Sequence, residues 1–89
     1  MVPVADEYPP QVLVVDDNTA NLKVATTLLR ECGYVVLTAK DGAAGFRRAI
    51  HTRPDLVLLD IEMPVLDGYE TCRRMKAHPV TADVPIIFM

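Results

Sequence analysis

The sequence DLVLLDIEMP, residues 55–64, decides the fold. Residues 56–59 form an apolar run without polar alternation, which is typical of a strand buried on both faces of a parallel sheet. Asp60 follows at once and would lie at the carboxyl end of that strand, where ligands of open α/β sheets bind. A second apolar run, residues 12–15, ends in Asp16-Asp17. Two such strands side by side would bring three carboxylates to one edge of a sheet.

Strand and helix patterns alternate along the rest of the chain. Apolar residues recur at helical spacing between the apolar runs, and Gly, Pro, Asn and Asp separate the segments. This alternation predicts an α/β domain with a doubly wound parallel sheet and right-handed crossovers. The expected strands are residues 11–15, 34–39, 56–59 and 84–89, and the expected helices are residues 19–32, 43–51 and 68–76. Residues 1–10, with three prolines, are expected to be a flexible lead-in to a domain over residues 11–89.

Local signals predict several details of the helices. Gly33 is placed to be the left-handed residue that ends the first helix, and Pro54 is expected to push Arg53 into extended geometry. Gly45 is expected to weaken the second helix by about 1 kcal/mol relative to Ala. Helical spacing predicts the buried face of the first helix as Leu22, Ala25, Leu28, Leu29 and Cys32.

The three carboxylates indicate a cation site. A lone Asp at a strand end is usually a turn residue or a helix cap, but Asp16, Asp17 and Asp60 together would repel one another and raise one another's pKa. Mg²⁺ relieves such repulsion and prefers carboxylate and phosphate oxygens. An Asp beside that ion can act as a nucleophile and form an aspartyl phosphate. Spacing alone therefore favours a metal-assisted phosphoryl site over coincidence.

Four motifs in this order resemble the receiver domain of two-component response regulators. They are VLVVDDN (12–18), DG (41–42), DLVLLDIEMPVLDG (55–68) and VPIIFM (84–89), and they cover nearly all of the chain after the lead-in. The resemblance implies a flavodoxin-like sheet with strand order 2-1-3-4. It implies that Asp60 accepts a phosphoryl group from the phosphohistidine of a sensor histidine kinase or phosphotransfer protein. It also implies that Mg²⁺ is held by Asp17, by Asp16 through water, by Asp60 and by the backbone carbonyl of Glu62.

Compared with that family, the sequence stops after its fourth strand. The fourth helix, fifth strand and fifth helix are missing, together with the Ser or Thr after the fourth strand and the Lys after the fifth. We therefore expect impaired phosphoryl transfer, because losing a preorganised group that stabilises developing charge costs about 10²–10³ in rate. The third and fourth strands would keep an apolar face and an open edge, which predicts self-association as a homodimer or larger assembly. A natural end at residue 89 and a fragment of a longer receiver both stay open, and the fragment is favoured.

Composition restricts the other possibilities. The net charge of −3 and the lack of a Lys/Arg cluster in the sequence give no indication of nucleic-acid binding. No signal peptide or membrane-length apolar run is present, so a cytoplasmic location without membrane contact is expected. Cys32 and Cys72 match no metal or redox spacing and are expected to be small buried hydrophobes. His51 and His78 are expected to be solvated polar residues.

A signalling module rather than an enzyme is the leading hypothesis for function. One alternative is an interaction module that cannot be phosphorylated and only self-associates or binds a kinase. The other is a phosphohydrolase with Asp60 as its nucleophile and Glu62 two residues later, but such hydrolases usually carry the nucleophile on their first strand and need a longer chain.

Overall fold

The computed structural model describes residues 9–89, which alternate between strand and helix. The elements are β1 Gln11–Val15, α1 Thr19–Glu31, β2 Val35–Ala39, α2 Gly42–Thr52, β3 Leu56–Leu59, α3 Gly68–Ala77 and β4 Ile86–Phe88. Every expected strand and helix is present, with ends that differ from the prediction by up to two residues. Most of the predicted lead-in, residues 1–8, lies outside the described residues.

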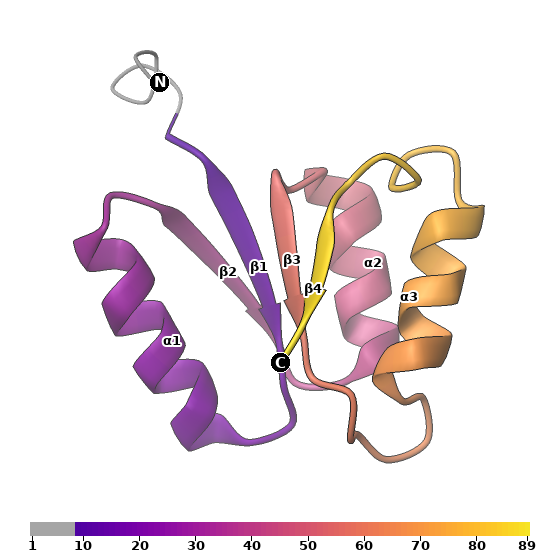
Figure 1. Cartoon of the computed structure of the whole chain (residues 1–89), viewed down its shortest axis with the longest axis horizontal. Coiled ribbons are helices and arrows are strands. Elements are labelled where there is room, and N and C mark those ends of the chain that lie inside the picture. The colour runs from indigo at the N-terminus through magenta and orange to yellow at the C-terminus, as the bar shows by residue number, and fades with distance from the viewer. Residues whose placement is uncertain (1–8) are drawn as a thin grey trace.

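The four strands form one parallel sheet in the order β2-β1-β3-β4, which confirms the predicted topology (Figure 1). The register pairs Val15 of β1 with Ala39 of β2 and with Leu59 of β3. The carboxyl ends of these three strands are therefore level. The residues that directly follow β1 and β3 leave the sheet at the same edge.

Helices cover the two faces of the sheet unequally. Helix α1 lies on one side, and α2 and α3 lie together on the other (Figure 1). The larger core lies under α2 and α3 and contains Leu13, Val57, Leu59 and Met75. Odd-numbered residues of β1 and β3 point into this core, and even-numbered residues point to the α1 side. The apolar runs predicted to be buried on both faces thus contribute to two separate cores.

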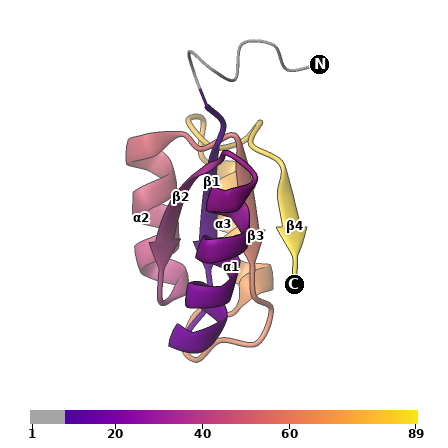
Figure 2. The ribbon, with the colours of Figure 1, turned by 90° about the vertical axis from the view of Figure 1, so that its left-hand side faces the viewer.

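On the α1 side, part of the apolar surface of β3 and β4 is left open. Leu56 and Leu58 are only half-buried, and Ile87 of β4 is 53% exposed. Figure 2 shows no helix among residues 9–89 on the side of β4 that faces away from α2. The prediction of an uncovered apolar face on β3 and β4 is confirmed for the described residues.

The expected geometry of Arg53 was wrong. Its backbone is left-handed, with φ 46° and ψ 67°, and its N–H donates to the carbonyl of Ala49 at 2.8 Å. Pro54 does disfavour the right-handed helical region for Arg53, but a left-handed residue is a common way for a helix to end, and Arg53 adopts that conformation instead of an extended one. Gly33, with φ 93°, has the predicted left-handed conformation after α1.

The expected buried face of α1 was too wide. Leu22 is buried and Leu29 is half-buried against the sheet, but Leu28 is 57% exposed and Cys32 is exposed. Leu28 lies about 100° around the helix from Leu29, so the sheet surface formed by β1 and β2 does not reach it. The second cysteine, Cys72, is half-buried beside the larger core.

Candidate functional site

Asp16, Asp17 and Asp60 meet at the carboxyl edge of the sheet, as the sequence predicts. The backbone N–H of Asp60 donates to the carbonyl of Val15 at 2.9 Å, which keeps the first residue after β3 beside the end of β1. One carboxylate oxygen from each of the three residues lies within 4.8 Å of the other two. Two parallel strands with level ends therefore produce the cluster.

Hydrogen bonds from the start of α1 orient Asp16. The Asp16 side chain is buried, and its two oxygens accept from the Asn18 N–H at 2.9 Å and from the Asn21 Nδ2 at 3.1 Å. Asn18 also caps α1 by accepting from the Asn21 N–H at 3.1 Å. The sequence patterns did not indicate Asn21 as a partner of Asp16. Its position one turn into α1, on the side of the Asp pair, is the signal that could have identified it.

Asp60 is oriented by the loop that follows it. Its Oδ1 accepts from the Glu62 N–H at 3.2 Å. The pKa of Asp60 is raised above its ordinary value of 3.8, first by burial and then by repulsion from Asp16 and Asp17, while the Glu62 N–H opposes the shift. Glu62 therefore contributes its backbone to the site, and its side chain is exposed. The predicted role of its carbonyl as a metal ligand stays a prediction.

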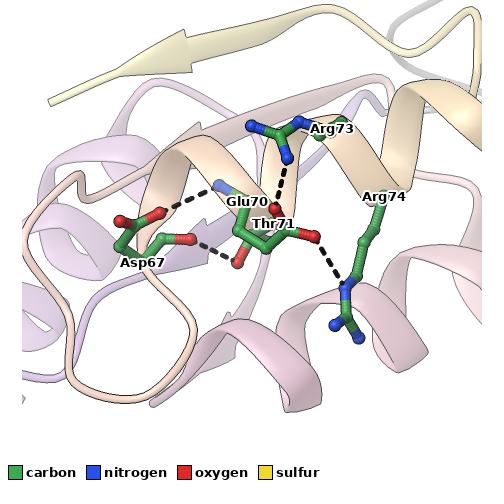
Figure 3. Close-up of polar contacts among 5 residues, drawn as sticks. All are labelled: Asp67, Glu70, Thr71, Arg73 and Arg74. Carbon is green, nitrogen blue, oxygen red and sulfur yellow. Dashed lines mark hydrogen bonds and ion pairs between the residues drawn. The ribbon is translucent and has the colours of Figure 1, made fainter.

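The start of α3 fixes the loop between residues 60 and 67. Gly68 donates its N–H to the Ile61 carbonyl at 2.9 Å, and a Cβ on Gly68 would meet the backbone of Asp60 and Ile61. Asp67 caps the helix by accepting from the Glu70 N–H at 2.9 Å (Figure 3). The backbone that carries Asp60 is thus held directly against α3.

Ion pairs secure the first turns of α3. Glu70 accepts from Arg73 at 2.8 Å and from Arg74 at 3.2 Å (Figure 3). These pairs are exposed and stabilise the helix by only a few tenths of a kcal/mol each. Both Arg73 and Arg74 lie on the exposed face of α3.

The donor set fits a hard divalent cation. The oxygens of Asp16, Asp17 and Asp60 are ligands that Mg²⁺ prefers, and a small carboxylate set leaves coordination positions for water and a phosphate oxygen. After burial, repulsion from Asp16 and Asp17 contributes to the raised pKa of Asp60, and a bound cation would relieve that repulsion. Geometry and charge therefore both favour a cation at this edge.

Comparison with known proteins assigns the family. The family model described as "Response regulator receiver domain" matches residues 12–89. The chain belongs to the response regulator receiver family. Receiver domains are signalling modules of two-component systems and have an acidic pocket for Mg²⁺, and this chain has the matching Asp cluster.

Curated proteins similar to this chain include regulators that are longer than it. RpaA, a DNA-binding dual master transcriptional regulator of Synechocystis sp., is 35% identical over 90% of this chain and 33% of its own length. The transcriptional regulatory protein PrrA of Mycobacterium leprae is 47% identical over 86% of this chain and 32% of its own length. The chain thus spans about a third of the length of these two relatives.

Solved receiver structures have the same fold. The N-terminal domain of a response regulator receiver protein from Methanoculleus marisnigri JR1 has a TM-score of 0.87 and 42% identity, covering 89% of this chain and 64% of its own. The receiver domain of sensor histidine kinase PA1611 from Pseudomonas aeruginosa PAO1 has a TM-score of 0.85 and 39% identity, covering 89% and 65%. That structure has a magnesium ion coordinated in its active-site cleft. Within residues 9–89 of the present chain, no helix is long and apolar enough to cross a membrane.

Proposed function

We propose that Asp60 accepts a phosphoryl group from the phosphohistidine of a sensor histidine kinase or a phosphotransfer protein. The observation that carries the proposal is the cluster of Asp16, Asp17 and Asp60, with oxygens within 4.8 Å, in a chain of the receiver family. Asp60 is the member of the cluster at the end of the central strand β3, and its side chain is partly accessible. It is therefore placed to meet a phosphoryl group from solvent.

The chemistry is a displacement at phosphorus. A carboxylate oxygen of Asp60 forms the new P–O bond while the P–N bond to the imidazole breaks, and the leaving imidazole nitrogen takes a proton from water. The Glu62 N–H donates to Oδ1 of Asp60 and so fixes the orientation of the carboxylate. Asp16, Asp17, Asp60 and the Glu62 carbonyl are the proposed metal-binding groups. Bound Mg²⁺ would neutralise charge on the carboxylates and on the transferred phosphoryl group.

Incubation of the chain with Mg²⁺ and acetyl phosphate tests this proposal. Intact mass spectrometry is expected to show the addition of one phosphoryl group that Asp60→Asn abolishes. Asp83→Asn is the matched control, because Asp83 is an exposed aspartate outside the cluster. Phosphate retained at full level on Asp60→Asn would contradict the assignment of Asp60.

We further propose that a polypeptide of these 89 residues accepts phosphate slowly and self-associates. The slow transfer rests on the family's Ser or Thr and Lys groups, which none of these residues provides at the corresponding positions, and the expected loss is about 10²–10³ in rate. Self-association rests on the exposed apolar surface of β3 and β4.

A cytoplasmic location remains a prediction. Steady turnover of a generic phosphate ester would instead favour the phosphohydrolase alternative.

A further inference from the structure

The open edge of β2 gathers cationic side chains that are far apart in the sequence. Among residues 9–89, strand β2 is at the end of the sheet order and is next to β1 only. A groove of about 430 Å³ runs between β2 and α1, and a second of about 420 Å³ runs between β2 and α2. The basic side chains that line them are Lys23, Arg30 and Lys40 in the first groove and Arg47, Arg48 and His51 in the second.

The charge of these grooves is one-sided. They hold five of the nine Lys and Arg residues of a chain whose net charge is −3, and within residues 9–89 no carboxylate lines either groove. In that described part of the chain the ion pairs join only Arg73 and Arg74 to Glu70, on α3. The five cations therefore face solvent without an acidic partner in the part of the chain that the structure describes, which favours an anionic ligand.

The backbone of β2 also offers hydrogen-bonding groups at this open edge. Val35 donates its N–H to the Pro10 carbonyl at 2.9 Å, and the Ala39 carbonyl accepts from Asp16 at 3.1 Å, so both residues bond towards β1. Successive residues of a strand direct their N–H and C=O groups to opposite edges. Val36 and Thr38 consequently present theirs to the open edge, and Thr38 lines both grooves.

We propose that this edge binds an extended acidic segment of a partner protein as an added strand. Main-chain hydrogen bonds to Val36 and Thr38 would fix the segment, as in other cases of strand addition to a sheet edge. Side chains of a strand point alternately to its two faces. Acidic side chains at successive positions would therefore reach the α1 groove and the α2 groove in turn, and both are cationic.

Other occupants fit less well. Two copies of this chain paired through β2 would bring like charges together, which is unfavourable. A nucleic acid would meet the cations but would leave the N–H and C=O groups of Val36 and Thr38 without strand partners. Edge lysines and arginines can also serve only to prevent aggregation, in which case no acidic peptide binds. These alternatives are separate outcomes of the experiment.

The first measurement is amide hydrogen exchange on the unaltered chain. The probe is a capped peptide of glutamate and threonine, about six residues long as strands commonly are, with glutamates at odd and even positions. Bound peptide is expected to slow exchange at Val36 and Thr38 by about tenfold and to leave Leu37, which bonds to β1, unchanged. The same peptide N-methylated at every amide should not bind, because neither of its edges then carries an N–H group. Equal binding of both peptides, or no protection at Val36 and Thr38, would overturn the proposal.

Variants then separate the backbone from the charges. Thr38→Pro removes the outward N–H at an edge position that tolerates proline and is expected to weaken peptide binding about tenfold. The double variant Arg47→Gln, Arg48→Gln should weaken it similarly. Arg73→Gln, Arg74→Gln removes the same charge from α3 and should leave affinity unchanged. Equal loss in both double variants, or an oligonucleotide that competes and is insensitive to Thr38→Pro, would contradict an acidic-strand site. If Thr38→Pro does not fold, the exchange data on the unaltered chain decide.

Discussion

Asp60 destabilises the metal-free fold when it is ionised. Burial and the neighbouring carboxylates raise its pKa above 3.8, so the folded state binds the proton more tightly than the unfolded state does. Stability from this group is therefore present at acid pH and is lost as the pH rises from about 3.8 through the raised pKa. We expect Asp60→Asn to increase the free energy of unfolding at neutral pH in EDTA, measured by urea denaturation, with little effect at pH 3.

Mg²⁺ should reverse the order of stability of the parent chain and the Asp60→Asn variant. Saturating Mg²⁺ is expected to stabilise the unaltered chain more than Asp60→Asn, because a ligand stabilises the state that binds it. Asp83→Asn serves as the control and should change neither profile, since Asp83 is exposed and outside the cluster. An Asp60→Asn variant that is less stable than the parent in EDTA would contradict the assumed charge repulsion.

Gly68 supports the proposed metal site through the backbone. A Cβ at this position would meet the Asp60 carbonyl and lie 2.7 Å from the Ile61 Cα, so the loop must move to admit it. We expect Gly68→Ala to raise the Kd for Mg²⁺ by roughly tenfold, the usual effect of disturbing a group that orients a ligand. Isothermal titration calorimetry measures this. Gly33→Ala is the control, because it strains a left-handed turn but has nothing within 4 Å of its Cβ. Equal Mg²⁺ affinity in Gly68→Ala and the parent would contradict a role of Gly68 in placing the Asp60 backbone.

At the scale of elements, Gly45 brings α2 close to β1. A Cβ there would lie 2.8 Å from the Val15 Cγ2 and 3.0 Å from its Cγ1, and Val is stiff at χ1 and cannot turn away cheaply. Helix propensity alone predicts that Gly45→Ala stabilises the chain by about 1 kcal/mol. Overpacking costs about 1–3 kcal/mol, so after the propensity gain of about 1 kcal/mol we expect net destabilisation of up to about 2 kcal/mol in urea denaturation.

The exposed position Ala43 in the same helix provides the control for propensity. Ala43→Gly should destabilise the chain by about 1 kcal/mol without a packing contribution. A stabilising Gly45→Ala would show that α2 can move away from β1.

Sequence patterns predicted the elements and the acidic edge because both depend on local periodicity and strand ends. The order of apolar runs and the Asp residues after β1 and β3 were sufficient to place Asp16, Asp17 and Asp60 together. The features that the sequence patterns failed to predict depend on the neighbours of each element. The exposure of Leu28 follows from the extent of the sheet under α1, and the conformation of Arg53 from the way in which α2 ends.

The same limit applies to charge at the scale of the molecule. Five cations that form no cluster in the sequence line two grooves beside β2 once α1 and α2 are packed. The two open edges of the sheet therefore differ. The β2 edge is flanked by cations, which disfavour pairing with a second copy, whereas β4 presents Ile87, Phe88 and Met89 as exposed apolar side chains.

This difference predicts which side of the chain self-associates. Burying an exposed aliphatic or aromatic side chain stabilises an assembly by about 1.5–3 kcal/mol, and β4 has no strand partner beyond β3 in residues 9–89. We expect the 89-residue chain to show an apparent mass above that of a monomer in light scattering at micromolar concentration, rising with concentration. Ile87→Lys should return it towards a monomer, because it places a charge on the open face. Val24→Lys, at a position 60% exposed on α1, should have little effect. A parent chain that is monomeric throughout, or equal responses to both lysines, would show that the β4 side is not the contact.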